Sequence, residues 1–159
     1  MFTMSIAASS SSREASSSVS DTLLDASRND ELAAIDMVNI WSHSSIAPKP
    51  SSPAPGFHVM GGSRRLMQYV SRHSPEKVFF TDFSACNAYQ NGAAAAQAIA
   101  CPTLFLLGRR DMMTPPKAAM ALAAAIAGAR LVQIDGSGHA LMAEQPDAVL
   151  DALFEFVAG

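Results

Sequence analysis

The sequence predicts an α/β fold in which a helical region is followed by the last strand–helix–strand–helix of a parallel sheet. From Cys101 onward, two apolar runs each end near a glycine, and each is followed by a helix-forming stretch. Continuous apolar runs are typical of strands that are buried on both faces. The connections between these elements are short, which favours a right-handed parallel crossover. The region before Cys101 consists of expected helices and loops.

The composition excludes several classes of protein. A chain of 159 residues is long enough for one domain with a sizeable core, and 49% hydrophobic residues suit such a core. The formal net charge of -3 and the pI near 5.7 give no electrostatic reason to expect a nucleic acid or an anionic membrane as a partner. No apolar window approaches the roughly 18 residues that a membrane-spanning helix needs. No basic segment precedes the weakly apolar amino end, as it would in a signal peptide. We therefore expect a cytoplasmic protein.

The two cysteines, Cys86 and Cys101, lack the spacing of a metal site. A single disulfide between them stays open as an alternative. The pattern favours two small, buried thiols in a reducing compartment.

The first 92 residues are expected to form a tail and several helices. Residues 1–19 are rich in serine and have little to bury, which predicts disorder. Ser20 and Asp21 are expected to begin one helix, and Asn29-Asp30-Glu31 can cap a second. The second helix carries an apolar stripe, formed by Leu32, Ile35, Met37, Val38 and Trp41. Four prolines within 47–56 predict a loop, and further helices are expected over 64–71, 81–89 and 93–100.

The last 57 or so residues carry the strands. Thr103–Leu107 and Leu131–Ile134 are the two expected strands. Between them, Thr114 is expected to cap a helix over 117–127, with proline in its first turn. Gly128 is expected at its carboxyl end. A final helix is expected over 146–157, with one apolar side formed by Val149, Leu150, Leu153, Phe154 and Val157.

Three motifs in this region resemble the carboxyl-terminal part of the α/β-hydrolase family. The first is Pro102-Thr-Leu-Phe-Leu-Leu-Gly108-x-x-Asp111-x-x-Thr114-Pro-Pro. It is followed by Ile134-x-Gly136-x-Gly138-His139 and then by Glu144-x-Pro146 before an amphipathic helix. The resemblance covers about residues 100–158, and it is specific because order, spacing and flanking elements agree. It implies three regions: a Ser-rich tail over 1–19, a helical cap-like region over 20–92 and the carboxyl-terminal part of the hydrolase core over 93–159.

The resemblance implies that Asp111 is the acid and His139 the general base of a Ser-His-Asp triad. In such a triad a carboxylate fixes the tautomer of the imidazole and stabilises the imidazolium that forms when the nucleophile loses its proton. Both residues follow strands at the carboxyl edge of the sheet, where ligands bind in open α/β folds. We therefore expect the two side chains to lie within hydrogen-bond reach. This chemistry requires neither a metal nor a cofactor.

A nucleophile is harder to locate. The family places its serine on a strand-to-helix elbow, Gly-x-Ser-x-Gly or a near variant, upstream of the acid and the base. The nearest candidate is Ser63 in Gly61-Gly62-Ser63-Arg64-Arg65, after the short apolar run 57–60. Arg65 stands where the elbow needs a small residue, so the nucleophile stays unknown. Cys86 is interpreted as a buried filler.

Two functions therefore remain open. The first is an acyl or ester hydrolase, in a chain that lacks the half of the fold with the elbow. Its substrate would be a small apolar ester or acyl compound. The alternative is a non-catalytic binding or interaction remnant of the hydrolase fold. In both cases an exposed sheet edge is expected to favour self-association or the binding of a complementing chain.

Overall fold

The computed structural model describes residues 19–44, 59–74 and 76–159. Its elements in chain order are α1 (Asp21–Asn29), α2 (Glu31–Trp41), α3 (Val59–His73), α4 (Val78–Ala88), α5 (Gly92–Gln97), β1 (Leu104–Gly108), α6 (Pro116–Ala124), β2 (Arg130–Ile134), α7 (Leu141–Glu144) and α8 (Pro146–Ala158). The expected disorder of the tail, the proline-rich loop over 47–56 and the start of the apolar run at 57–60 lie outside the described residues.

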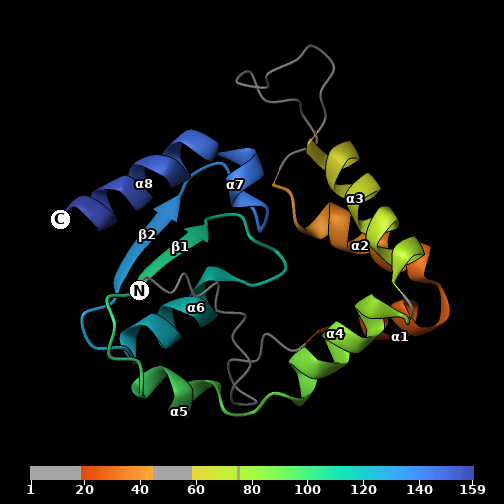
Figure 1. The fold of residues 1–159 in the computed structure, drawn as a ribbon, viewed down its shortest axis with the longest axis horizontal. Helices are drawn as coiled ribbons and strands as arrows, with labels where there is room; N and C mark the ends of the chain where they lie inside the picture. Colours follow the sequence, from red (N-terminus) through yellow and green to blue (C-terminus); the bar gives the residue numbers. More distant parts are fainter. Residues whose placement is uncertain (1–18, 45–58, 75) are drawn as a thin grey trace.

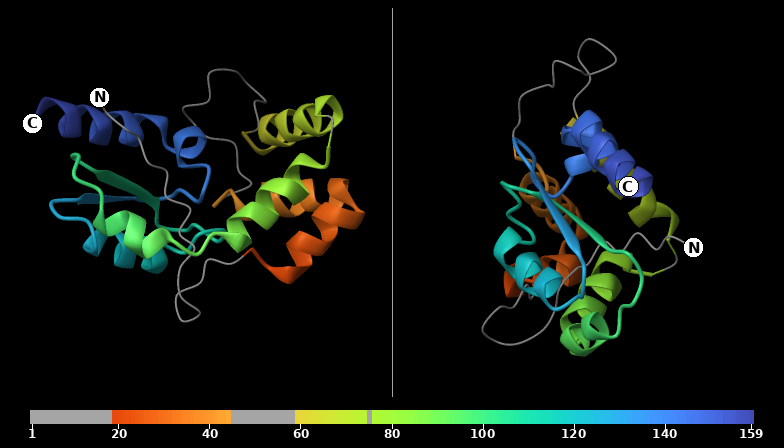
Figure 2. Two further views of the ribbon diagram at one scale, coloured as in Figure 1. Left: turned by 60° about the horizontal axis from the view of Figure 1, so that its bottom comes forward. Right: turned by 90° about the vertical axis from the view of Figure 1, so that its left-hand side faces the viewer.

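The molecule has a helical part and a sheet part. Helices α1–α4 pack on one another, while β1 and β2 are flanked by α5 and α6 on one side and by α7 and α8 on the other (Figure 1). Both strands point toward the helical part, so the carboxyl edge of the sheet faces it. The left view of Figure 2 shows the same division from a second direction.

Helix α1 begins where the sequence predicts, because Ser20 accepts a hydrogen bond from the Leu23 N–H. Asp30 does the same for α2 through the Ala33 N–H. Between α2 and α3, Arg64 donates two hydrogen bonds to the Asp36 carboxylate, at 2.5 and 3.0 Å. Caps, packing and this ion pair together hold the helical part.

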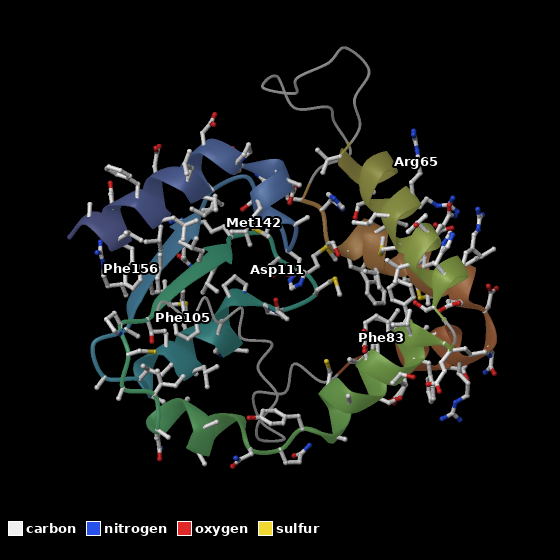
Figure 3. All side chains as sticks on the ribbon, viewed as in Figure 1. Arg65, Phe83, Phe105, Asp111, Met142 and Phe156 are labelled. Carbon is white, nitrogen blue, oxygen red and sulfur yellow. The ribbon has the colours of Figure 1, made fainter. Side chains whose placement is uncertain are left out.

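Strands β1 and β2 pair in parallel, with Leu104 opposite Arg130 and Gly108 opposite Ile134. Helix α6 forms the connection between them, as the sequence predicts. Phe105 is 5% exposed and forms the centre of a core with Ala96, Ala123 and Ile126 (Figure 3). Val149 and Ala152 of α8 are buried as well. The sheet is therefore covered on both faces, which explains the continuous apolar runs.

Several local expectations are wrong. On α2 the buried side chains are Ala34, Ile35 and Asn39, whereas Leu32 of the expected stripe is 55% exposed. Helix α6 ends at Ala124, before the expected residue 127, and Gly128 lies in the following turn with φ +72°. The expected helix over 81–89 begins earlier, at Val78.

The expected apolar side of α8 is only partly buried. Leu150, Phe154 and Val157 are 65%, 73% and 62% exposed, although each is large and hydrophobic. They lie four and three residues apart, so they share one face of the helix. This face, together with the edge of β1 that does not pair with β2, is open in the described structure. We call these two surfaces the open face.

Both cysteines are free thiols and both are exposed. The expectation that Cys86 and Cys101 are buried is therefore wrong. Cys86 lies near the end of α4, and Cys101 precedes β1. Within the described residues, no helix is long and apolar enough to cross a membrane.

Candidate active site

The end of β1 carries the carboxylate of the site. After Gly108 the chain turns, and the Asp111 N–H donates to the Gly108 carbonyl over 3.2 Å. Gly108 is required here because a Cβ at this position would lie 2.0 Å from the Gly138 carbonyl oxygen. The loops after β1 and β2 therefore meet in close contact. Asp111 lies beyond the strand, between the sheet and the helical part (Figure 3).

The end of β2 carries the imidazole. Gly136 has φ +68°, which an L side chain rarely adopts, so the chain turns sharply before His139. The Arg110 N–H donates to the Ser137 carbonyl over 2.9 Å and ties this loop to the loop of Asp111. The glycine-rich spacing of the sequence thus places Asp111 and His139 at one edge of the sheet.

Asp111 and His139 form a hydrogen-bonded pair. His139 Nδ1 lies 2.9 Å from Asp111 Oδ2. The Asp111 side chain is 8% exposed, whereas the His139 side chain is 38% exposed. Within the described residues, Nε2 of His139 has no hydrogen-bond partner. The ring is therefore held from its Nδ1 side by the carboxylate and is free to exchange a proton at Nε2.

Thr114 completes the surroundings of the carboxylate. Its hydroxyl donates to Asp111 Oδ2 over 2.7 Å and lies 3.1 Å from His139 Nδ1. The backbone N–H groups of Met113 and Thr114 both donate to Asp111 Oδ1 over 2.9 Å. The sequence predicts Thr114 as a helix cap, but Pro115 occupies the cap position and α6 begins at Pro116. The Thr114 hydroxyl donates to the Asp111 carboxylate and does not cap the helix.

These contacts set the ionisation of Asp111. Burial alone would raise the pKa of this carboxyl, but hydrogen bonds from His139 and Thr114 outweigh the burial and hold the pKa below its ordinary value of 3.8. Asp111 is therefore a carboxylate at neutral pH and stabilises a positive charge on the imidazole.

Ser63 does not lie on a strand-to-helix elbow. It is an interior residue of α3, which begins at Val59 and continues to His73. The described residues around this candidate are therefore helical and form no strand-to-helix elbow. Glycines at 61 and 62 are tolerated in this helix, although each costs roughly 1 kcal/mol relative to alanine. In the described structure no hydrogen bond joins Ser63 to His139.

The other candidate side chains also lie outside the pair. Cys86 is on α4, and His73 stacks on Tyr69 of α3. His43 follows the end of α2, is 7% exposed and has its Nδ1 2.7 Å from the Asn39 carbonyl. His58 is outside the described residues. Among the described residues, no group of three or more His, Cys, Asp or Glu side chains is arranged to hold a metal ion.

Comparison with known proteins identifies the family of this chain. A family model described as the alpha/beta hydrolase family matches residues 5–152. This chain belongs to the alpha/beta hydrolase family. The expected fold class is thereby confirmed, as a partial hydrolase fold with a small parallel sheet.

Solved structures show the same fold. The chain superimposes on an esterase from Exiguobacterium antarcticum with a TM-score of 0.70 and 16% identity, over 87% of this chain and 47% of that one. An esterase from Thermogutta terrifontis gives a TM-score of 0.69 and 22% identity, over 96% of this chain and 53% of that one. A bromoperoxidase from Bacillus anthracis gives a TM-score of 0.70 and 18% identity, over 87% and 48%.

Among curated proteins, this chain is 39% identical over 64 residues to the pimeloyl-[acyl-carrier protein] methyl ester esterase of Xanthomonas campestris. That match covers 40% of this chain and 25% of the esterase. The chain spans about half the length of the three solved proteins described above. This chain is thus similar to several proteins that are described as esterases.

Proposed function

We propose that this chain supplies the general base and the acid of an acyl or ester hydrolase of the Ser-His-Asp type. One observation supports the proposal above all: His139 Nδ1 lies 2.9 Å from a largely buried, ionised Asp111, while Nε2 is unpaired within the described residues. A side chain held at Nδ1 by a carboxylate has Nε2 as its proton acceptor. This is the tautomer that a general base in acyl transfer requires.

The proposed reaction follows from this geometry. A serine hydroxyl attacks the ester carbonyl while His139 Nε2 takes its proton, and a tetrahedral oxyanion forms. His139 then gives the proton to the leaving alkoxide, which departs as the alcohol. Water attacks the acyl-enzyme in the same way and releases the carboxylic acid. Throughout, Asp111 accepts a hydrogen bond from His139 Nδ1 and stabilises the imidazolium.

We propose that the serine and the oxyanion-binding N–H groups come from a segment equivalent to the part of the solved hydrolases that this chain does not cover. Two facts support this: the described residues contain no elbow, and about half of each relative lies outside the superposition. Helices α1–α4 face the carboxyl edge of the sheet, and we propose that they act as a cap over the substrate. The two free cysteines suit a reducing compartment, which supports a cytoplasmic location.

For the substrate we propose a small apolar ester or acyl compound. Met112 adjoins Asp111 and is 70% exposed, and Met142 lies three residues after His139 and is 55% exposed. Flexible, polarisable methionine side chains suit contact with an apolar acyl group. The likeness to an esterase that acts on a methyl ester supports the same class.

The test is complementation. The segment of the Thermogutta terrifontis esterase that this chain does not cover is co-expressed with the chain, and hydrolysis of p-nitrophenyl butyrate is measured. We expect little turnover by the chain alone and clear turnover by the complex. A fluorophosphonate probe should then label the serine of the partner segment.

Variants of the pair decide whether the chain supplies the base. His139→Ala should abolish the turnover and the labelling. Asp111→Asn should lower kcat by as much as about 10⁴-fold, as the same change does in serine proteases. A folded complex without hydrolysis, or hydrolysis that survives His139→Ala, would contradict the proposal.

A second candidate function is a non-catalytic interaction module, and the open face is the observation that favours it. Leu150, Phe154 and Val157 are exposed together, and β1 has an unpaired edge. Such a surface binds a further strand or helix. A complex that forms through this surface but never reacts with the fluorophosphonate would favour the interaction module.

A further inference from the structure

Glu144 is a buried carboxylate that takes no part in the proposed proton transfer. It lies at the end of α7 and is 2% exposed. Burying a carboxylate costs several kcal/mol unless hydrogen bonds replace its water. The groups that bind Glu144 therefore indicate what this residue does.

Its two oxygens connect segments that are 94 residues apart in the sequence. Oε2 accepts a hydrogen bond from the Gly138 N–H over 2.6 Å. Oε1 accepts from the Ser44 N–H over 2.8 Å and lies 2.7 Å from the Ser44 hydroxyl. Gly138 directly precedes His139, and Ser44 belongs to the segment that follows α2. Glu144 thus ties the loop of the proposed base to the helical part.

Further contacts show that this segment lies along the His139 loop on both sides of the histidine. The Ala140 N–H donates to the Ser42 carbonyl over 2.8 Å. The Ser44 hydroxyl is also 2.8 Å from the Gly136 carbonyl. A Cβ on Gly138 would lie 3.0 Å from both the Ser42 oxygen and the Ser44 nitrogen. The fit is close, so a displacement of Ser42–Ser44 would displace the backbone of His139.

We propose that Glu144 is a positioning residue that holds His139 against Asp111 by binding Gly138 and Ser44 at once. The function of this restraint rests on the proposed function of the pair. A carboxylate suits the position because each of its oxygens accepts from a backbone N–H, that of Gly138 or that of Ser44. An amide would turn an NH₂ group toward one of these donors. A movement of the segment after α2 should therefore move His139 as well.

The experiment compares Glu144→Gln with the wild-type chain by NMR, in the full chain at neutral pH. A proton on His139 Nδ1 that is bound to a carboxylate gives a far-downfield resonance, and His139→Ala identifies it. In Glu144→Gln we expect this resonance to be lost or broadened and the Gly138 amide to exchange faster with solvent. Glu155→Gln removes an exposed carboxylate of α8 and serves as the matched control. It should leave both signals unchanged.

Each outcome has a definite meaning. If Glu144→Gln is folded and keeps the downfield resonance, Glu144 does not position His139. If Glu144→Gln does not fold, Glu144→Asp decides, because it keeps both acceptor oxygens on a side chain that is one methylene too short to reach Gly138 and Ser44 at once. A broadened resonance in Glu144→Asp supports the proposal, and an unchanged one overturns it. The NMR signals do not require turnover. A complementation assay without hydrolysis would therefore refute the proposed function and leave this inference standing.

Discussion

Asp111 is the residue on which the chemistry of the site depends, and its charge is set by its neighbours. It accepts from two backbone N–H groups, from the Thr114 hydroxyl and from His139. Because its pKa lies below 3.8 in the folded chain, the unfolded chain binds more protons as the pH falls toward that value. Asp111 therefore contributes stability that is fully present above about pH 4. This stability is lost as the pH falls through the folded pKa.

Thr114→Val tests the contribution of the hydroxyl to this effect. Valine keeps the branched shape but cannot donate to Asp111, so the pKa of Asp111 should rise toward its ordinary value. We expect a loss of about 1 kcal/mol in the free energy of unfolding at neutral pH. The loss should shrink as the pH falls below 4. Urea denaturation at a series of pH values measures both effects.

Thr114→Ser is the matched control, since it keeps the hydroxyl and removes only a methyl group. It should retain the low pKa of Asp111. If valine and serine behave alike across the pH series, the hydroxyl is not responsible.

For single residues, the sequence predicts a position in the site where the neighbouring residues along the chain determine it. Asp111 and His139 each follow an apolar strand and a glycine, so their meeting at one sheet edge follows from parallel pairing. Glu144 is part of a sequence motif, but its contact with Ser44 depends on how the helical part folds back. The sequence around Thr114 has the pattern of a helix cap, but the Thr114 hydroxyl donates to the Asp111 carboxylate instead. Ser63 fails as an elbow because its Gly-Gly step lies within a helix.

At the scale of elements, α2 shows how far periodicity predicts packing. The apolar pattern of this helix includes both Leu32 and Ile35, yet Ile35 is fully buried and Leu32 is 55% exposed. The neighbours α1 and α3 select the buried side, and periodicity alone does not identify them. The existence of α1, α2, β1, β2 and α8 is predictable from caps, glycines and apolar runs. α7 is not, because a helix of four residues has no periodic signal.

Ile35→Ala and Leu32→Ala test this packing within one helix. The first should lower the free energy of unfolding by about 2–5 kcal/mol, because it leaves a cavity between helices. The second should change it by less than about 0.5 kcal/mol. Chemical denaturation followed by circular dichroism gives both values. Equal losses would contradict the packing of α2 described above.

At the scale of the whole molecule, the open face is the feature that the composition alone does not reveal. A single side of α8 was expected to be buried, but the described sheet has two strands and covers only Val149 and Ala152 of that helix. Large exposed apolar side chains that share one helix face favour association.

We therefore expect the chain to self-associate through the open face. Leu150→Lys combined with Phe154→Lys keeps the helix propensity and should weaken association about 10–100-fold. Sedimentation velocity over a range of concentrations measures the change. Met120→Lys, at a 45% exposed position on α6, is the control. If the double variant associates as strongly as the wild type, α8 is not the contact surface.

One strand–helix–strand unit, from β1 to the loop after β2, carries both Asp111 and His139. The two residues are 28 positions apart, and the segment between them consists of α6, β2 and their connecting loops. An exchange of segments with its ends outside this interval would therefore keep Asp111 and His139 on one chain. The contacts of Glu144 with Ser44 would depend on the segments on either side.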